Sequence, residues 1–376
     1  MTSGGLVGTI NPDNGKVIGT LRLEGEEIHN SFAIDETGGV FIASDHAMYR
    51  FDAGKNGKPI IAWRELYDRG TRIKPGQFGQ GTGTTPTLIG KEFITIADNS
   101  DPYMHVLVYR RAKEVTGSRL VCNESVFGEN KGDTENSLIA TDKSIIVENN
   151  YGYSGPQATM QGNATEPGVT RIDINPDGGC GTVWNSPERV PNVVSKMSLA
   201  NGLVYTYTKD PGPGTTDAWY FTAIDFETGK TVYKRLTGTG LYYNSHYAGL
   251  YLGPDGTAYV GVIGGLVAIR DPVMLGAGDN GRKIELNKGQ TLVITLEANP
   301  TTGYTWEAAE FDEQVLRQVG EIEFQPESSA IGAGGVQILR FEAVNSGKTS
   351  LKLVYHRPWE KNVKPLKTFS LQVIVR

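Results

Sequence analysis

"HNSFAIDETGGVFIAS", residues 29–44, contains the pattern that decides the fold of most of this chain. A polar entry leads into a short apolar run, a turn with two glycines follows, and a second apolar run begins directly after it. Two such runs joined by a Gly-containing turn predict a pair of antiparallel β-strands. Patterns of amphipathic helices are nearly absent, so the chain is predicted to be all-β.

The same pattern returns four times further along the chain. It appears as "TTPTLIGKEFITIAD" from Thr84, "ENSLIATDKSIIVEN" from Glu135, "VSKMSLANGLVYTYT" from Val194 and "HYAGLYLGPDGTAYVGV" from His246. The second runs, marked at Phe41, Ile94, Ile146, Val204 and Tyr259, follow one another at steps of 53, 52, 58 and 55 residues. A period near fifty residues with about four short strands per repeat is typical of β-propeller blades. Residues 1–271 are therefore predicted to form a propeller-like repeat domain of about five to six blades, with a general resemblance to quinoprotein-like and six-bladed β-propellers.

The same four residues occur near the start and near the end of this array, at the position of the third strand in the repeat. "GGLV" at 4–7 recurs at 264–267, where it opens a third strand. The N-terminal piece could close a ring against the last repeat, or the chain could start partway through a blade. We favour the second interpretation, an N-terminally truncated propeller, because a closed ring shares strands between its ends without duplicating one.

Polar residues open three of the predicted inner strands. They are His29, Asn30, Glu135, Asn136, Asn244 and His246. Such residues could line a central channel and bind a small polar ligand or an ion. We favour the simpler interpretation that the asparagines satisfy backbone groups of the turns.

Charge and composition exclude several classes of partner. The net charge is -6 and the isoelectric point is near 5.5, which predicts no binding to nucleic acid or to anionic membranes. No apolar run approaches the roughly 18 residues that a membrane-spanning helix needs. The start of the chain lacks the basic and apolar regions of a signal peptide. We nevertheless expect an extracellular or periplasmic protein from the predicted architecture.

The two cysteines, Cys122 and Cys180, are too few for a disulfide-rich scaffold and do not form a CxxC pair. They fall at similar places in neighbouring repeats, so a disulfide between blade edges and two buried thiols both remain open. The five histidines lack metal-ligand spacing, and no catalytic motif is present. The sequence therefore predicts no enzyme, no metal and no cofactor.

The pattern changes after Asp271. Residues 272–282 contain Pro272, three glycines and Asn280, and are predicted to be a linker. From Lys283 onward, apolar and polar residues alternate in short runs, as in "TLVITLEA" at 291–298 and "TFSLQVIV" at 368–375. About seven such strands, each with one apolar face, predict an immunoglobulin-like antiparallel β-sandwich over 283–376.

Three unusual segments interrupt these strands. "NPTTGYTW" at 299–306 is too long for a simple hairpin turn, "GAGG" at 332–335 invites close approach of another backbone, and "RPW" at 357–359 offers Arg and Trp, which are common in binding hot spots. If these segments share one end of the sandwich, they form a wedge that fits a groove.

In this order and spacing, the three segments resemble the chagasin family, whose members are reversible inhibitors of papain-like cysteine peptidases. The resemblance covers roughly 282–376. It implies that the first segment enters the catalytic cleft and that the other two lie on either side of it. The residues implied to bind the peptidase are Asn299, Pro300, Thr301, Thr302, Gly303, Tyr304, Gly332, Ala333, Gly334, Gly335, Arg357, Pro358 and Trp359.

These patterns predict a protein inhibitor of papain-like cysteine peptidases, with the propeller as a platform or a ligand-binding module. The alternative is a propeller enzyme, or a protein that binds a small ligand or ion, with the sandwich as an accessory interaction domain. The sandwich carries three matched loops and the propeller carries no matched catalytic set, so the inhibitor is favoured.

Overall fold

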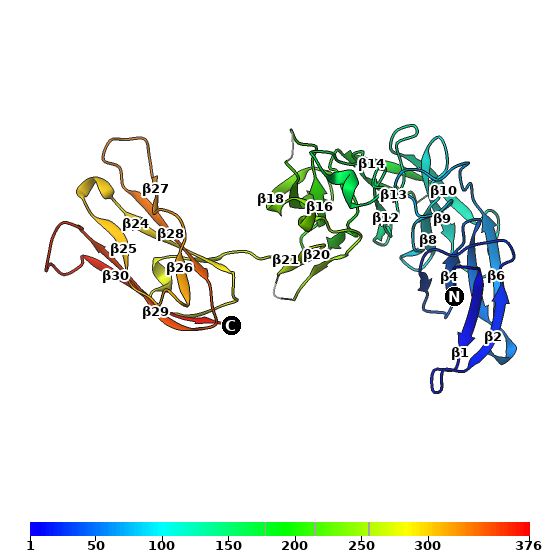
Figure 1. Cartoon of the computed structure of the whole chain (residues 1–376), viewed down its shortest axis with the longest axis horizontal. Helices are drawn as coiled ribbons and strands as arrows, with labels where there is room; N and C mark the ends of the chain where they lie inside the picture. Colours follow the sequence, from blue (N-terminus) through cyan, green and yellow to red (C-terminus); the bar gives the residue numbers. More distant parts are fainter. Residues whose placement is uncertain (177, 214–215, 255) are drawn as a thin grey trace. The chain divides into compact units, whose positions relative to one another are not determined.

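The computed structural model describes residues 1–176, 178–213, 216–254 and 256–376. The chain is all-β and forms two compact units (Figure 1). The first contains residues 1–253 and 258–268, and the second contains residues 269–376 with the segment 254–257. Within the described residues, short 3-10 helices are the only helices between the strands.

The first unit is a succession of antiparallel sheets, each built from strands that are consecutive in the sequence. One four-stranded sheet contains β3 (Phe32–Ile34), β4 (Val40–Ala43), β5 (Ala47–Ala53) and β6 (Pro59–Leu66), and the next contains β7 (Thr87–Ile89), β8 (Phe93–Ala97), β9 (Met104–Arg110) and β10 (Leu120–Val126). A third contains β11 (Ile139–Ala140), β12 (Ser144–Glu148), β13 (Val169–Ile174) and β14 (Cys180–Ser186). A fourth contains β15 (Lys196–Ser198), β16 (Leu203–Lys209), β17 (Ala218–Asp225) and β18 (Thr231–Thr239). The five marker residues of the sequence period all lie in the second strand of their sheet. Each repeat of about fifty residues therefore corresponds to one sheet.

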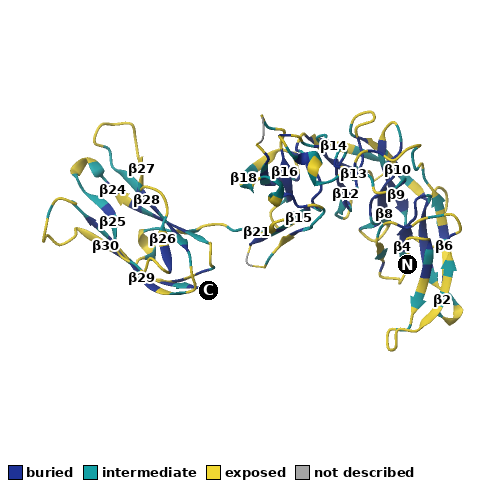
Figure 2. Ribbon diagram, viewed as in Figure 1, coloured by how far each residue is buried: buried dark blue, intermediate teal, exposed yellow. Residues whose placement is uncertain are grey.

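The two ends of the array form smaller sheets. At the start, β1 (Leu6–Ile10) pairs with β2 (Val17–Arg22), and at the end a three-stranded sheet contains β19 (Leu250–Leu252), β20 (Ala258–Val262) and β21 (Gly265–Ile269). The strands at the two ends belong to separate sheets, so they do not build one shared blade. Figure 2 shows that β12 and β16 are largely buried, whereas β2 is mostly exposed.

Asparagines before the first strands connect one sheet to the next. The Asn30 Nδ2 atom donates a hydrogen bond to the Thr82 carbonyl at 2.9 Å, and Asn136 Nδ2 donates to the Val193 carbonyl at 2.6 Å. Both bonds join segments more than fifty residues apart. Satisfying buried carbonyls in this way stabilises each joint by about 1 kcal/mol. These two asparagines thus serve the backbone, as the simpler sequence interpretation expected.

Buried arginines also connect neighbouring sheets by hydrogen bonds, at two places. On β5, Arg50 Nη1 donates to the Arg111 carbonyl at 2.9 Å, and on β13, Arg171 Nη1 donates to the Phe226 carbonyl at 2.9 Å. The Trp184 indole donates to that same Phe226 carbonyl at 2.8 Å. Each arginine lies in the third strand of its sheet and reaches the end of the third strand of the next one, so the sheets are bonded in chain order.

A disulfide connects the outer strands of two neighbouring sheets. Cys122 of β10 and Cys180 of β14 are bonded, with their Cα atoms 5.5 Å apart. That separation is within the usual range for disulfides. Of the two alternatives left open by the sequence, the structure contains the bridge rather than two free thiols.

The second unit is a sandwich of two sheets. One sheet has the order β22 (Val273–Leu275), β24 (Thr291–Ala298), β28 (Gly335–Ala343) and β26 (Leu316–Gln318), and β27 (Glu323–Pro326) also pairs with β28. The other sheet has the order β23 (Lys283–Leu286), β30 (Lys367–Val375), β29 (Gly347–His356) and β25 (Thr305–Glu310). Alternate residues such as Leu292, Leu339, Leu353 and Leu371 are buried between the sheets. The predicted sandwich is present, with eight strands within 283–376 where about seven were expected, and β22 before them adds a ninth. Short edge strands carry no clear sequence pattern of their own.

The predicted linker at 272–282 needs a correction. Val273–Leu275 form β22, which pairs in parallel with β24, and both Val273 and Leu275 pack against the sandwich core. Asn280 Oδ1 accepts a hydrogen bond from the Ser370 backbone N–H at 2.8 Å. The Gly and Asn residues suggested a free linker, but two apolar residues and an available sheet edge incorporate this segment into the second unit.

Candidate functional site

The three singled-out segments meet at one end of the sandwich because of strand register. Segment 299–304 connects β24 to β25, segment 332–335 leads into β28, and segment 357–359 follows β29. In the first sheet Ala298 is paired with Gly335, and in the second Thr305 is paired with His356. Each pairing places the adjoining loops next to each other (Figure 1).

The first loop is held in shape by its own side chains. Pro300–Thr302 form one turn of 3-10 helix, and the Asn299 Oδ1 atom caps it by accepting from the Thr301 N–H at 3.2 Å and the Thr301 hydroxyl at 2.6 Å. The Thr302 hydroxyl donates to the Asn299 carbonyl at 2.6 Å. Gly303 then turns the chain away with φ of 84°, a conformation that favours glycine. Both threonine side chains remain exposed.

Direct hydrogen bonds tie the other two loops to the first. Asn299 Nδ2 donates to the Gly332 carbonyl at 3.2 Å, and Arg357 Nε donates to the Thr302 carbonyl at 3.2 Å. The Asn299 backbone N–H also donates to the Tyr355 hydroxyl at 2.8 Å, which anchors the loop to the core. The three segments therefore form one bonded surface.

Aromatic packing completes this surface. The Trp359 ring lies against Gly303, where a Cβ atom would collide with it, yet Trp359 is 65% exposed. The Arg357 guanidinium lies 4.6 Å from the centre of the Tyr304 ring, and Tyr304 in turn packs 5.4 Å from Tyr355. Trp359 is thus held in place by its contact with Gly303 while most of its side chain stays exposed, which suits contact with a partner.

The residues of the "GAGG" segment differ in what they do. Gly335 begins β28 beside β27, and a Cβ there would collide with the Gln325 backbone, so this glycine is required by strand pairing. Gly332 has φ of 81° and accepts the hydrogen bond from Asn299. Next to it, Ile331 is fully exposed. Sequence reasoning missed Ile331, although an apolar residue within "SSAIGAGG" was a usable signal.

A groove of about 600 Å³ borders the first two loops. Its lining includes Glu297, Asn299, Glu327, Gly335, Tyr355 and Lys367.

Charged partners fix the third loop. Glu360 accepts a hydrogen bond from Arg357 Nη1 at 3.0 Å and thereby raises the pKa of that guanidinium. His356 bonds Glu307 at 2.9 Å, away from the exposed loop surface. The loop surface itself offers hydroxyls, carbonyls and one indole, without a nucleophile and base arranged for catalysis.

Within the described ranges, no group of three or more His, Cys, Asp or Glu side chains is placed to hold a metal ion. No helix in the same part of the chain is long and apolar enough to cross a membrane.

A sandwich with three bonded, exposed loops at one end is an arrangement typical of proteins that bind a partner through preformed loops. Residues 285–373 match the family described as Chagasin family peptidase inhibitor I42. Amoebiasin-1 of Entamoeba histolytica is 33% identical over 98 residues, which cover 26% of this chain and 94% of amoebiasin-1. Through its second unit, the chain belongs to the chagasin family of peptidase inhibitors, which are not enzymes, and the resemblance inferred from the three motifs is confirmed.

Two other similarities extend this comparison. A protein from Archaeoglobus fulgidus is 26% identical over 301 residues, covering 71% of this chain and 58% of that protein. The chain therefore spans less than two thirds of the length of this relative. The crystal structure of the cysteine protease inhibitor EhICP2 from Entamoeba histolytica is 26% identical, covers 28% of this chain and 95% of the other, and has a TM-score of 0.26.

Proposed function

We propose that the second unit reversibly inhibits papain-like cysteine peptidases by inserting the 299–304 loop into the catalytic cleft. Segments 332–335 and 357–359 would contact the enzyme on either side of that loop. The observation that carries this proposal is the bonding of all three segments into one surface through Asn299, Arg357 and Trp359. Family membership supports it independently.

The chemistry of the first loop suits such a cleft. A papain-like enzyme attacks with a thiolate paired to an imidazolium. Because the Thr301 and Thr302 hydroxyls already donate within the loop, they offer a partner acceptor oxygens, which fit an imidazolium N–H. Gly303 turns the backbone away, so the loop occupies the cleft without placing a cleavable carbonyl at the thiolate. No covalent bond is required.

The energetics also favour tight binding. The loops are bonded to one another before contact, so little conformational entropy is lost when they bind. Protease–inhibitor interfaces of standard size bury about 800 Å² on each partner. Trp359, with its open indole face, is the expected hot spot.

Titration of papain with the whole chain tests this proposal. We expect stoichiometric, reversible inhibition, and a Thr302→Ala/Trp359→Ala variant that inhibits at least about thirtyfold more weakly with an unchanged circular dichroism spectrum. Ser346→Ala, an exposed change in the loop between β28 and β29 at the opposite end of the sandwich, is the matched control. Full inhibition by the double variant would show that these loops do not carry the activity.

For the first unit we propose a β-propeller that serves as a platform. The period near fifty residues, the one-sheet-per-repeat correspondence and the repeated joints at Arg50 and Arg171 support this proposal. The domains would then be the propeller over 1–271 and the inhibitor over 283–376, with β22 from the intervening segment added to the inhibitor.

We infer that the protein works in an oxidising compartment, extracellular or periplasmic. The disulfide between Cys122 and Cys180 supports this location, since such bonds persist mainly outside reducing cytosol. A papain-like peptidase acting in the same compartment is the expected partner.

A further inference from the structure

The first unit contains a group of buried acceptor atoms that receive no hydrogen bond from any described residue. They belong to the segment before β11 and are both carboxylate oxygens of Asp133, Oε1 of Glu135 and Oδ1 of Asn136. Asp133 is 0% exposed and Asn136 is 3% exposed. Buried polar atoms are nearly always paired, and an unpaired carboxylate is especially costly. When both carboxyl groups are ionised, all four atoms are acceptors, so what this place lacks in that state is a hydrogen-bond donor.

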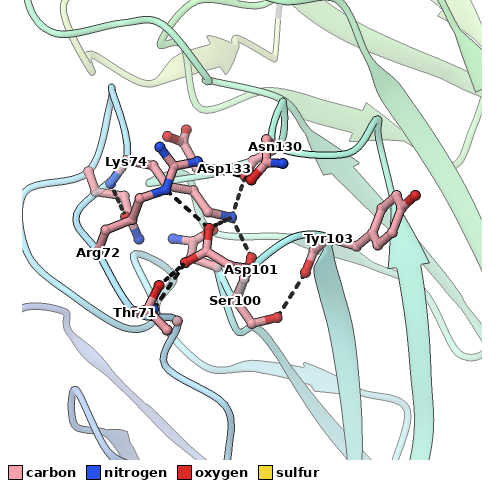
Figure 3. Close-up of polar contacts among 12 residues, drawn as sticks. Thr71, Arg72, Lys74, Ser100, Asp101, Tyr103, Asn130 and Asp133 are labelled. Atoms are coloured by element: carbon pink, nitrogen blue, oxygen red, sulfur yellow. Dashed lines mark hydrogen bonds and ion pairs between the residues drawn. The ribbon is translucent and has the colours of Figure 1, made fainter.

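The nearest buried cation does not supply that donor. Lys74 Nζ donates to the Ser100 carbonyl at 2.5 Å and to the Gly132 carbonyl at 2.9 Å, and it lies 3.9 Å from Asp101 Oδ1 (Figure 3). Asp133 lies in the same cluster, but no described Lys, Arg or His forms an ion pair with it. Lys74 therefore acts on Asp133 through its charge but donates no hydrogen bond to it.

A glycine-rich loop closes over the two carboxylates. A Cβ atom on Gly76 would lie 2.9 Å from both carboxylate oxygens of Asp133, and a Cβ on Gly83 would collide with the Glu135 carboxyl group. The Phe78 backbone, in the same loop, opposes the rise that burial and the Asp133 charge cause in the pKa of the Glu135 carboxyl group. Only glycines permit the loop to approach both acids this closely.

Aromatic rings surround the same loop. The Phe78 ring is 69% exposed and lies 5.1 Å from the Tyr247 ring, which is 5.4 Å from the Tyr153 ring. The Tyr247 hydroxyl donates to the Gly76 carbonyl at 3.4 Å. Burial, and next the charge of Glu135, raises the pKa of the Tyr247 hydroxyl, which places this ring in the electrostatic field of the acid.

The backbone that carries these rings is strained. His246 has φ of 41° and Tyr247 has φ of 65°, and neither is a glycine. Two successive residues of this kind are costly, by about 1 kcal/mol or more each, and such strain concentrates at functional sites. The strained backbone at His246 and Tyr247 thus accompanies the position of the Tyr247 ring beside Phe78, near Glu135.

We propose that Asp133, Glu135, Phe78 and Tyr247 form a binding site for a small protonated amine. The ammonium N–H groups would donate to the unpaired acceptors, the positive charge would compensate the carboxylates, and the aromatic faces would contact the cation. The exposed Phe78 ring provides the approach. A metal ion is less suitable, because the described residues offer no third metal-ligating side chain here and the rings are not oxygen ligands. This site is independent of peptidase inhibition.

Isothermal titration calorimetry of the whole chain with putrescine and with agmatine tests the site. We expect saturable binding of at least one amine, weakened at least tenfold by Asp133→Asn or Glu135→Gln. Phe78→Ala removes an exposed ring without risk to the core and is expected to weaken binding about threefold. Asp142→Asn is the charge-matched control, since Asp142 is exposed between β11 and β12.

Two further probes separate the alternatives. Tetramethylammonium carries a positive charge but neither N–H nor O–H, so it should bind at least tenfold more weakly than the amine. Equal binding of tetramethylammonium would overturn the role of the unpaired acceptors, and binding of calcium chloride alone would replace the amine site with a metal site. If the folded chain binds neither putrescine nor agmatine, or if the variants bind them normally, the proposal is wrong.

Discussion

Trp359 covers Gly303 so closely that a Cβ atom on Gly303 would collide with the six-membered ring of the indole. This contact joins the third loop to the first at the point where the backbone turns away from the proposed cleft. Gly303 therefore has two roles: it permits the turn of the backbone, and it leaves room for the Trp359 ring.

Gly303→Ala is expected to weaken inhibition of papain at least tenfold, because it displaces Trp359 and strains a residue with φ of 84°. The measurement is the inhibition constant of the whole chain. Gly320→Ala is the control, since Gly320 has a similar φ of 72° but no atom within 4 Å of its Cβ position. Equal losses in both variants would mean that backbone strain alone, and not the Trp359 contact, determines the effect.

Asn299→Asp should separate the two roles of this side chain. The aspartate keeps the oxygen that accepts from Thr301 but loses the Nδ2 donor to the Gly332 carbonyl. We expect faster hydrogen exchange in residues 328–335 and inhibition that is several-fold weaker, because the second loop is no longer held. Asn345→Asp, at the other end of the sandwich, should change neither quantity. Unchanged exchange in the second loop of the Asn299 variant would contradict the predicted link.

Removing the disulfide should destabilise the first unit and leave inhibition intact. Cys122 and Cys180 are 58 residues apart, and closing a loop of that length stabilises by about 4 kcal/mol in the chain-entropy description. The Cys122→Ala/Cys180→Ala variant should therefore unfold at a lower guanidinium concentration, with an unchanged papain inhibition constant. Reduction of the native protein with dithiothreitol controls for the lost side-chain volume and should produce a similar shift.

The stability of the first unit should fall as the pH rises through the neutral range. Burial raises the pKa of Asp133 to about 7, and burial together with the Asp133 charge raises that of Glu135 to about 8, while Lys74 acts on Asp133 in the opposite direction. Burial likewise raises the pKa of Glu148 to about 7. The folded protein keeps protons that the unfolded chain releases above about pH 4, so the free energy of unfolding decreases toward pH 8.

Thermal unfolding at pH 5, 6, 7 and 8 measures this slope. Asp133→Asn should flatten it, because asparagine has no proton to lose on unfolding. An equally steep slope in the variant would assign the pH dependence to other groups. Putrescine added at pH 8 should restore part of the lost stability if the amine site is present.

Much of the architecture followed from local patterns. The apolar alternation in 291–298 and 368–375 predicted strands with one buried face, and the structure has those faces in the sandwich core. The period marked by Phe41 and Ile94 predicted repeats that correspond to single sheets. Both signals are local, because side chains on a strand alternate and each sheet is built from neighbouring segments. The arrangement of those sheets in a propeller ring remains a prediction.

Other features depend on residues that are far apart in the sequence. The sequence predicts a linker where β22 lies, since a three-residue edge strand has no pattern of its own and forms only where β24 offers a free edge. The sequence also left the state of Cys122 and Cys180 open, because pairing depends on the distance between two sheets.

By itself, the sequence determined the three loop motifs, their order and the sandwich that carries them, because short-range pattern and turn chemistry encode these. Only the tertiary structure decided that Asn299, Arg357 and Trp359 bond the loops to one another, and that Asp133 and Glu135 lie buried beneath a glycine-rich loop without a donor. The physical reason is that hydrogen bonding and burial depend on which distant segments meet, and strand pairing in the folded chain settles that.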